Sequence, residues 1–172
     1  ADNTVATAKL QNGSVTTVKI ADSQITNTKM AANAITTSAI QDGQVTAAKI
    51  SNNEDFTINS ITVGKGANSV AGNTVLGESA LDASVSGGNN TAIGKQALTA
   101  LTSGASNTAV GMNALTNNTT GDSNTSVGRL SLASNTTGQQ NTAVGKGTLN
   151  GNTAANNNTA IGHQALNLNT TG

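Results

Sequence analysis

The residues of this sequence that could do chemistry are few, and none has a usual set of partners. His163 is the only histidine and there is no cysteine, so the chain holds no thiolate nucleophile and no Cys/His zinc site. Gly64-Lys65-Gly66 and Gly145-Lys146-Gly147 have the composition of phosphate-binding loops. They lack the earlier glycine and the following Ser or Thr that a Walker motif requires. We interpret these glycines as corners of a repeat.

Acidic residues are scattered, and glycoside hydrolysis needs a pair of carboxylates across the scissile bond. Only Glu54 and Asp55 are adjacent. A calcium site there would need further oxygen ligands, so a solvated turn is the favoured interpretation and calcium binding the alternative. We therefore expect no catalytic residue, no metal and no cofactor, and we do not expect an enzyme.

Composition excludes further classes of function. Charged residues make up 9% of the chain and the formal net charge is zero, so we expect no nucleic-acid partner. No apolar run approaches the roughly 20 residues of a membrane span, so we expect no membrane insertion. Phe56 is the only aromatic residue, whereas a compact enzyme core normally holds several. The chain starts at Ala1 and not at a Met, and its last repeat ends at Gly172 with no polar cap, so we expect it to be part of a longer protein.

Residues 73–172 repeat every seventeen positions in six units. Each unit opens with Asn-Thr, continues through Leu, Ile or Val and a glycine, and carries a leucine eight positions after its Asn. A fixed period of this length is typical of a solenoid. We predict a short strand over Thr-Ala-Val-Gly, a corner at its glycine, and a second short strand at Ala-Leu. The loop Asn-Thr-Thr-Gly then returns the chain, with its glycine free to take positive φ. The side chains Glu78, Lys95, Met112, Arg129, Lys146 and His163 share one repeat position, which must therefore be a solvent-facing corner.

Stacking such coils places each residue above its equivalent, about 4.8 Å away. We predict that asparagines and threonines form hydrogen-bonded ladders and that apolar residues form two buried columns. Leu115 is expected inside, between Leu98 and Leu132, with Thr119 facing water in the return loop. The leucine column comprises Leu81, Leu98, Leu115, Leu132, Leu149 and Leu166, and the second column Ile93, Val110, Val127, Val144 and Ile161.

Residues 1–50 repeat every ten positions, with two apolar residues five apart and a lysine just before the second in four of the five units. This spacing fits neither a helix nor a flat strand, so we predict a thin shaft formed by several chains around an axis. The lysines are expected to extend along the shaft and cover apolar surface rather than to bind anions. Residues 51–72 form a junction with a degenerate strand at 61–64. Phe56 lies in this junction, where we predict a packing plug in preference to a ligand site.

The small core of each coil favours oligomerisation. Burying a Leu or Val contributes roughly 1.5–3 kcal/mol, whereas ordering each of seventeen residues costs roughly 1–2 kcal/mol. Two large apolar residues per coil do not comfortably support an isolated coil, and partner chains would enlarge the shared core.

Two motifs resemble those of a known family. The unit Asn107-Thr-Ala-Val-Gly-Met-Asn-Ala-Leu115 resembles the NTAVGxxAL repeat of bacteriophage tail fibres, and Val15-Thr-Thr-Val-Lys-Ile20 resembles the VTTAKI repeats of their shafts. A similar motif occurs in the heads of trimeric autotransporter adhesins, but with a shorter coil. The tandem order favours the fibre, because an autotransporter stalk is more often a heptad coiled coil and no heptad is present. The sequence lacks the tyrosines of the common fibre repeat.

The resemblance implies an all-β, homotrimeric fibrous protein: a ten-residue-repeat shaft over 1–50, a junction over 51–72, and a β-solenoid of 17-residue coils over 73–172. It implies a structural segment of a virion tail fibre that positions a receptor-binding tip for host recognition. Its partners would be its own copies, other virion tail proteins and, through a region outside this chain, a host receptor. The alternative is a trimeric adhesin on the bacterial surface, whose solenoid head binds host matrix or cells.

Overall fold

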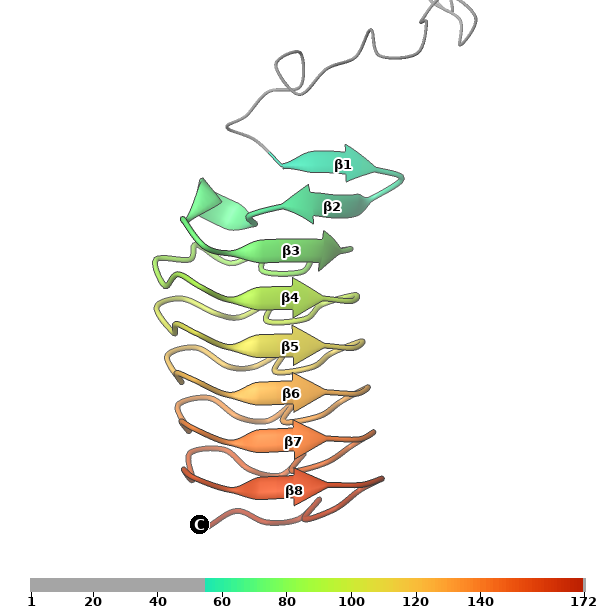
Figure 1. Ribbon diagram of the computed structural model, residues 1–172, viewed down its shortest axis with the longest axis vertical. Helices are drawn as coiled ribbons and strands as arrows, with labels where there is room; N and C mark the ends of the chain where they lie inside the picture. Colours follow the sequence, from blue (N-terminus) through green and yellow to red (C-terminus); the bar gives the residue numbers. More distant parts are fainter. Residues whose placement is uncertain (1–54, 172) are drawn as a thin grey trace, which may run out of the picture. The chain divides into compact units, whose positions relative to one another are not determined.

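The computed structural model describes residues 55–171, which form a β-solenoid (Figure 1). The chain divides into two units, Ala1–Ile50 and Ser51–Gly172, and only the second contains described residues. The predicted shaft and its lysines therefore lie outside them. No α-helix occurs between residues 55 and 171, and this part of the chain has no helix suited to crossing a membrane.

Six short parallel strands form one wall of the solenoid. Each pairs with the next at an offset of seventeen residues, so that Thr91 lies beside Thr108 and Thr108 beside Thr125. The predicted 17-residue coil and its strand at Thr-Ala-Val are thus confirmed. The strands are β3 (Thr74–Gly77), β4 (Thr91–Ile93), β5 (Thr108–Val110), β6 (Thr125–Val127), β7 (Thr142–Val144) and β8 (Thr159–Ile161).

A hairpin covers the N-terminal edge of this wall. Strands β1 (Phe56–Ile58) and β2 (Ile61–Gly64) pair antiparallel, and β2 pairs antiparallel with β3. The junction strand predicted at 61–64 is therefore confirmed, and a 3₁₀ turn, η6 (Ala67–Ser69), links it to the first coil. The backbone of Phe56 belongs to β1, but its side chain lies outside the described residues. Because β2 supplies hydrogen bonds to β3, the parallel sheet has no bare edge at this end.

The predicted leucine column is buried inside the coils. Leu81, Leu98, Leu115, Leu132 and Leu149 have no more than a trace of exposed surface. Leu166 is the exception, with 52% of its surface exposed, because no described coil follows to cover it.

The predicted second buried column is wrong for this chain. Successive side chains of a strand point to opposite faces, and it is the middle residue of each strand that points inward: Val75, Ala92, Ala109, Ser126, Ala143 and Ala160. The β-branched residues Ile93, Val110, Val127 and Val144 are half-buried on the outer face, and Ile161 is 71% exposed. The thin coil interior is filled by a small residue (Ala or Ser, with Val75 in the first coil) on one side and by Leu on the other.

The predicted second strand at Ala-Leu is also wrong. These residues form turns, in which every repeat leucine has φ between 48° and 53°. The left-handed conformation costs an L-residue roughly 1–2 kcal/mol, whereas burying a leucine contributes roughly 1.5–3 kcal/mol. Burial of the side chain therefore offsets the strain of the turn that directs it inward.

Glycine is needed at two points of each coil, for different reasons. At the strand end, Gly111 has φ 135°, and a Cβ there would lie 2.7 Å from the carbonyl of Gly128 in the next coil. This confirms the predicted corner. In the return loop, Gly104, Gly121 and Gly138 do not have positive φ, contrary to the prediction. A Cβ on Gly121 would lie 2.3 Å from the carbonyl oxygen of Gly138, so close approach of the coils requires this glycine.

Candidate functional site

The asparagine that opens each repeat forms a continuous ladder inside the solenoid. Asn90, Asn107, Asn124 and Asn141 are completely buried. In each step the Oδ1 atom of one residue accepts hydrogen bonds from both the backbone N–H and the side-chain amide of the next, over 2.8–3.3 Å. The amide also donates to a return-loop carbonyl, as from Asn107 to Gly121 at 2.8 Å. The predicted asparagine ladder is confirmed, and its polar atoms are occupied by structural bonds.

A second, shorter asparagine ladder lies at the start of the return loop. The amide of Asn135 donates to Oδ1 of Asn118 at 3.0 Å, and that of Asn152 donates to Oδ1 of Asn135 at 3.1 Å. All three residues are buried. The coil above has Leu101 at this position, also buried. The Asn-Thr-Thr-Gly pattern predicts a return loop but does not reveal that its first asparagine points inward.

Threonines divide into two columns with different roles. In the return loop, the hydroxyls of Thr102, Thr119 and Thr136 each donate to a backbone carbonyl of the next coil at 3.0 Å. This confirms a threonine ladder, but it corrects the expectation that Thr119 faces water, because this residue is half-buried. The strand threonines, by contrast, point outward beside the Val/Ile column.

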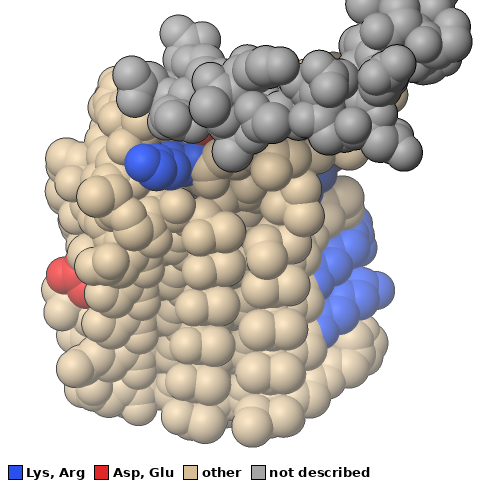
Figure 2. All heavy atoms as spheres, turned by 45° about the horizontal axis from the view of Figure 1, so that its top comes forward, with Lys and Arg blue, Asp and Glu red and all other residues tan. Residues whose placement is uncertain are grey.

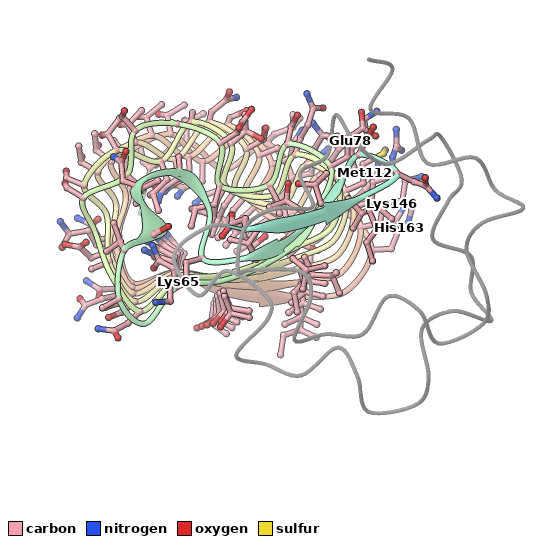
Figure 3. All side chains as sticks on the ribbon, turned by 90° about the horizontal axis from the view of Figure 1, so that it is seen from above. Lys65, Glu78, Met112, Lys146 and His163 are labelled. Carbon is pink, nitrogen blue, oxygen red and sulfur yellow. The ribbon has the colours of Figure 1, made fainter. Side chains whose placement is uncertain are left out.

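The corner after each strand carries the charged side chains of the wall. Glu78, Met112, Lys146 and His163 lie along this corner in Figure 3, and all four are exposed. The amine of Lys95 contacts the carboxylate of Glu78 at 2.9 Å, with about half of each side chain exposed. The predicted solvent-facing corner is therefore confirmed. His163 is not part of a metal cluster, since residues 55–171 contain no group of three His, Cys, Asp or Glu side chains.

Most described carboxylates bind the protein itself. Asp55 accepts the backbone N–H groups of Lys65 and Gly66, each at 2.7 Å. The segment Gly64-Lys65-Gly66 thus binds a carboxylate of its own chain instead of a phosphate. Asp122 accepts the N–H of Ala105 at 2.7 Å, one coil above.

A hollow lined by two carboxylates lies next to the N-terminal hairpin. It has a volume of about 320 Å³ and is lined by residues that include Asp55, Thr62, Leu81 and Asp82. Asp55 already binds two N–H groups with its two oxygens. This arrangement supports an anchoring role for the carboxylate.

The outer face of the parallel sheet is a surface without charged side chains on the described coils. Figure 2 shows rows of uncharged side chains over the strands, with basic side chains along one edge. At its N-terminal end, a hollow of about 470 Å³ is lined mainly by Ile61, Leu76 and Ile93, and also by Glu78 and Lys95. Sequence reasoning missed this surface because it assigned the Val/Ile column to the interior.

The described residues of the solenoid thus form hydrogen-bonded ladders, a thin apolar core and one uncharged face. No family model, no curated protein and no solved structure matches the chain.

Proposed function

We propose that this chain is a structural segment of a bacteriophage tail fibre. Its task is mechanical: it holds a receptor-binding tip at a distance from the virion and transmits the contact with the host. The observation that carries the proposal is the asparagine ladder, which runs from coil to coil along the axis. The NTAVGxxAL and VTTAKI motifs associate such a rod with tail fibres.

The ladders suit a load-bearing rod. Each coil is joined to the next by strand pairing, by two bonds to each ladder oxygen, and by return-loop bonds such as Thr119 N–H to Thr136 O at 2.9 Å. Bending the rod would stretch several of these bonds together. The resistance is therefore shared among the whole cross-section of a coil.

The partners in this proposal are other copies of the chain and other tail proteins. A homotrimer places three solenoids around one axis, and a region outside this chain contacts the host receptor. The chain does no chemistry in this role. The bonds that occupy Asp55 and Asp122 support an inert rod over an enzymatic tailspike.

Immunogold electron microscopy tests the proposal. Antibodies raised against residues 55–171 should label fibres that project from phage tails, in purified particles of the phage that encodes the chain. Labelling of the surface of uninfected bacteria, with bare phage tails, would overturn it and favour the adhesin. Antibodies preadsorbed with the purified segment provide the control.

A further inference from the structure

The outer face of the parallel sheet is partly exposed to solvent, which is unusual for a parallel sheet. We define this face by the strand threonines (Thr74, Thr91, Thr108, Thr125, Thr142, Thr159) and the aliphatic column beside them (Leu76, Ile93, Val110, Val127, Val144, Ile161). Leu76 is 44% exposed. The next four members of the column are half-buried, namely Ile93, Val110, Val127 and Val144. Parallel sheets normally have both faces covered, and exposed apolar patches of this kind mark interaction sites.

The aliphatic column continues into the N-terminal hairpin. Val63 lies opposite Leu76 in the sheet register, so both side chains point to the outer face. Val63 and Ile61 are 42% and 45% exposed. The column therefore extends over the hairpin as well as over the six parallel strands.

The chemistry of the face selects an uncharged partner. None of the face residues carries a charge, and among the described residues no hydrogen bond occupies the hydroxyls of the strand threonines. Charged side chains begin only at the corner beside the face, where Lys95 contacts Glu78. A nucleic acid or an acidic glycan would find no ligand for its anionic groups on this face.

The axial period of the face selects the partner further. Threonine and Val/Ile side chains recur once per coil, about 4.8 Å apart. A surface of different period would fall out of step with these columns within a few coils. A second copy of the chain has the same period, and columns of identical side chains on facing sheets can interdigitate in a dry interface.

We infer that the outer face of the parallel sheet is the interface through which copies of this chain pack side by side, in axial register. The parallel direction and the number of three copies rest on the proposed function. The location of the interface rests on the exposure, charge and period of the face itself.

Single-cysteine cross-linking tests the interface, since the natural chain contains no cysteine. Val127 lies on the outer face, whereas Thr137 is exposed in the return loop. Under mild oxidation, V127C should form disulfide-linked chains in parallel, in-register copies, and T137C should stay unlinked. Linking of T137C without V127C would place the interface elsewhere and overturn the inference.

The native mass supplies an independent measurement. The wild-type chain should have about three times the 16.9 kDa mass of one chain. V127D should reduce this mass about threefold, because a charge on each copy would enter the interface, whereas T137D should leave it unchanged. A wild-type chain that is folded and monomeric would overturn the inference. If V127D fails to fold, the cross-linking of the cysteine variants still tests the location of the interface.

The two proposals fail separately. If gold labels phage fibres but V127C does not cross-link, the proposed interface is wrong and the tail-fibre proposal still holds. If V127C cross-links but phage tails stay unlabelled, the proposed interface still holds and the tail-fibre proposal is wrong.

Discussion

The side-chain oxygen of Asn107 accepts two hydrogen bonds from Asn124, one from its backbone N–H at 3.0 Å and one from its side-chain amide at 3.1 Å. Asn124 in turn offers its own oxygen to Asn141 in the same way. Neighbouring coils are therefore tied together through side chains as well as through backbone pairing. Since these residues are fully buried, water cannot replace a lost bond.

Replacing a ladder residue should be costly. In N124A, the backbone N–H of Asn141 loses its acceptor, and the carbonyl of Gly138 keeps only its bond from the Asn135 amide at 2.9 Å. A buried group left without a partner costs about 1–3 kcal/mol, so we expect the free energy of unfolding to fall by about that amount. Urea unfolding followed by circular dichroism measures the change.

Asn117 provides the matched control for this variant. It is an exposed asparagine in the next coil up, and its backbone N–H bond to Ala133 survives truncation of the side chain. N117A should change stability by less than about 0.5 kcal/mol. Equal effects of N124A and N117A would contradict a structural role for the ladder.

The leucine column should tolerate no charge. L115D would place an unpaired charge inside the coil, where Leu115 is fully buried, and an unpaired buried charge costs about 3–5 kcal/mol. For a chain of this size that corresponds to a fall of roughly 6–20 °C in Tm. T137D, at an exposed position of the return loop, should melt close to the wild type. Indistinguishable melting curves for the two variants would refute the buried leucine column.

The strand-end glycine should not accept a methyl group. In G111A the new Cβ would meet backbone atoms of Gly128 at 2.7 Å, at a φ of 135° that L-residues rarely adopt. Strain and overpacking each cost roughly 1–3 kcal/mol, so we expect a loss of about 2 kcal/mol or more in chemical unfolding.

Gly147 distinguishes the effect of close contact between coils from the effect of a positive φ. Its φ is 66°, but a Cβ there would meet only the flexible side chain of Gln164, at an ordinary 3.5 Å. The equivalent residue two coils above is Asn113, with φ 59°. In urea unfolding, G147N should therefore be as stable as the wild type, or more stable by up to about 1 kcal/mol. A large destabilisation here would show that left-handed φ alone explains the need for glycine.

The rod should be chemically inert. Incubation with host polysaccharide should release no reducing ends, because Asp55 and Asp122 are engaged by backbone N–H groups and Glu78 by Lys95. A reducing-sugar assay with a heat-denatured sample as the blank measures this. Cleavage that depends on the folded protein would contradict the proposed structural role.

Sequence periodicity predicts the coil, its strand and its register, because identical residues recur at a fixed interval and strand pairing aligns them. It also predicts the ladder of opening asparagines and the leucine column. These features depend only on which residues repeat. They hold for Asn107 and Leu115 whatever the detailed path of the chain between strands.

Periodicity does not show which way a side chain points when both faces of a strand carry short residues. In Thr108-Ala109-Val110, hydrophobicity alone suggests that the valine is inside. The narrow interior instead admits only the alanine, and Val110 lies outside. The sequence does not predict the turn at Leu115 either, because leucine has no intrinsic preference for the left-handed conformation that burial imposes there.

Because each coil is bonded chiefly to its immediate neighbours, the rod is modular in length. Removing residues 107–123 would join Ser106 to Asn124, and the wild-type chain already joins Ser123 to Asn124. The register of strands and ladders would close again across the gap. Recombination between the repeated coding segments would thus shorten or lengthen the solenoid in whole steps of about 4.8 Å, and its length could evolve without any change to its cross-section.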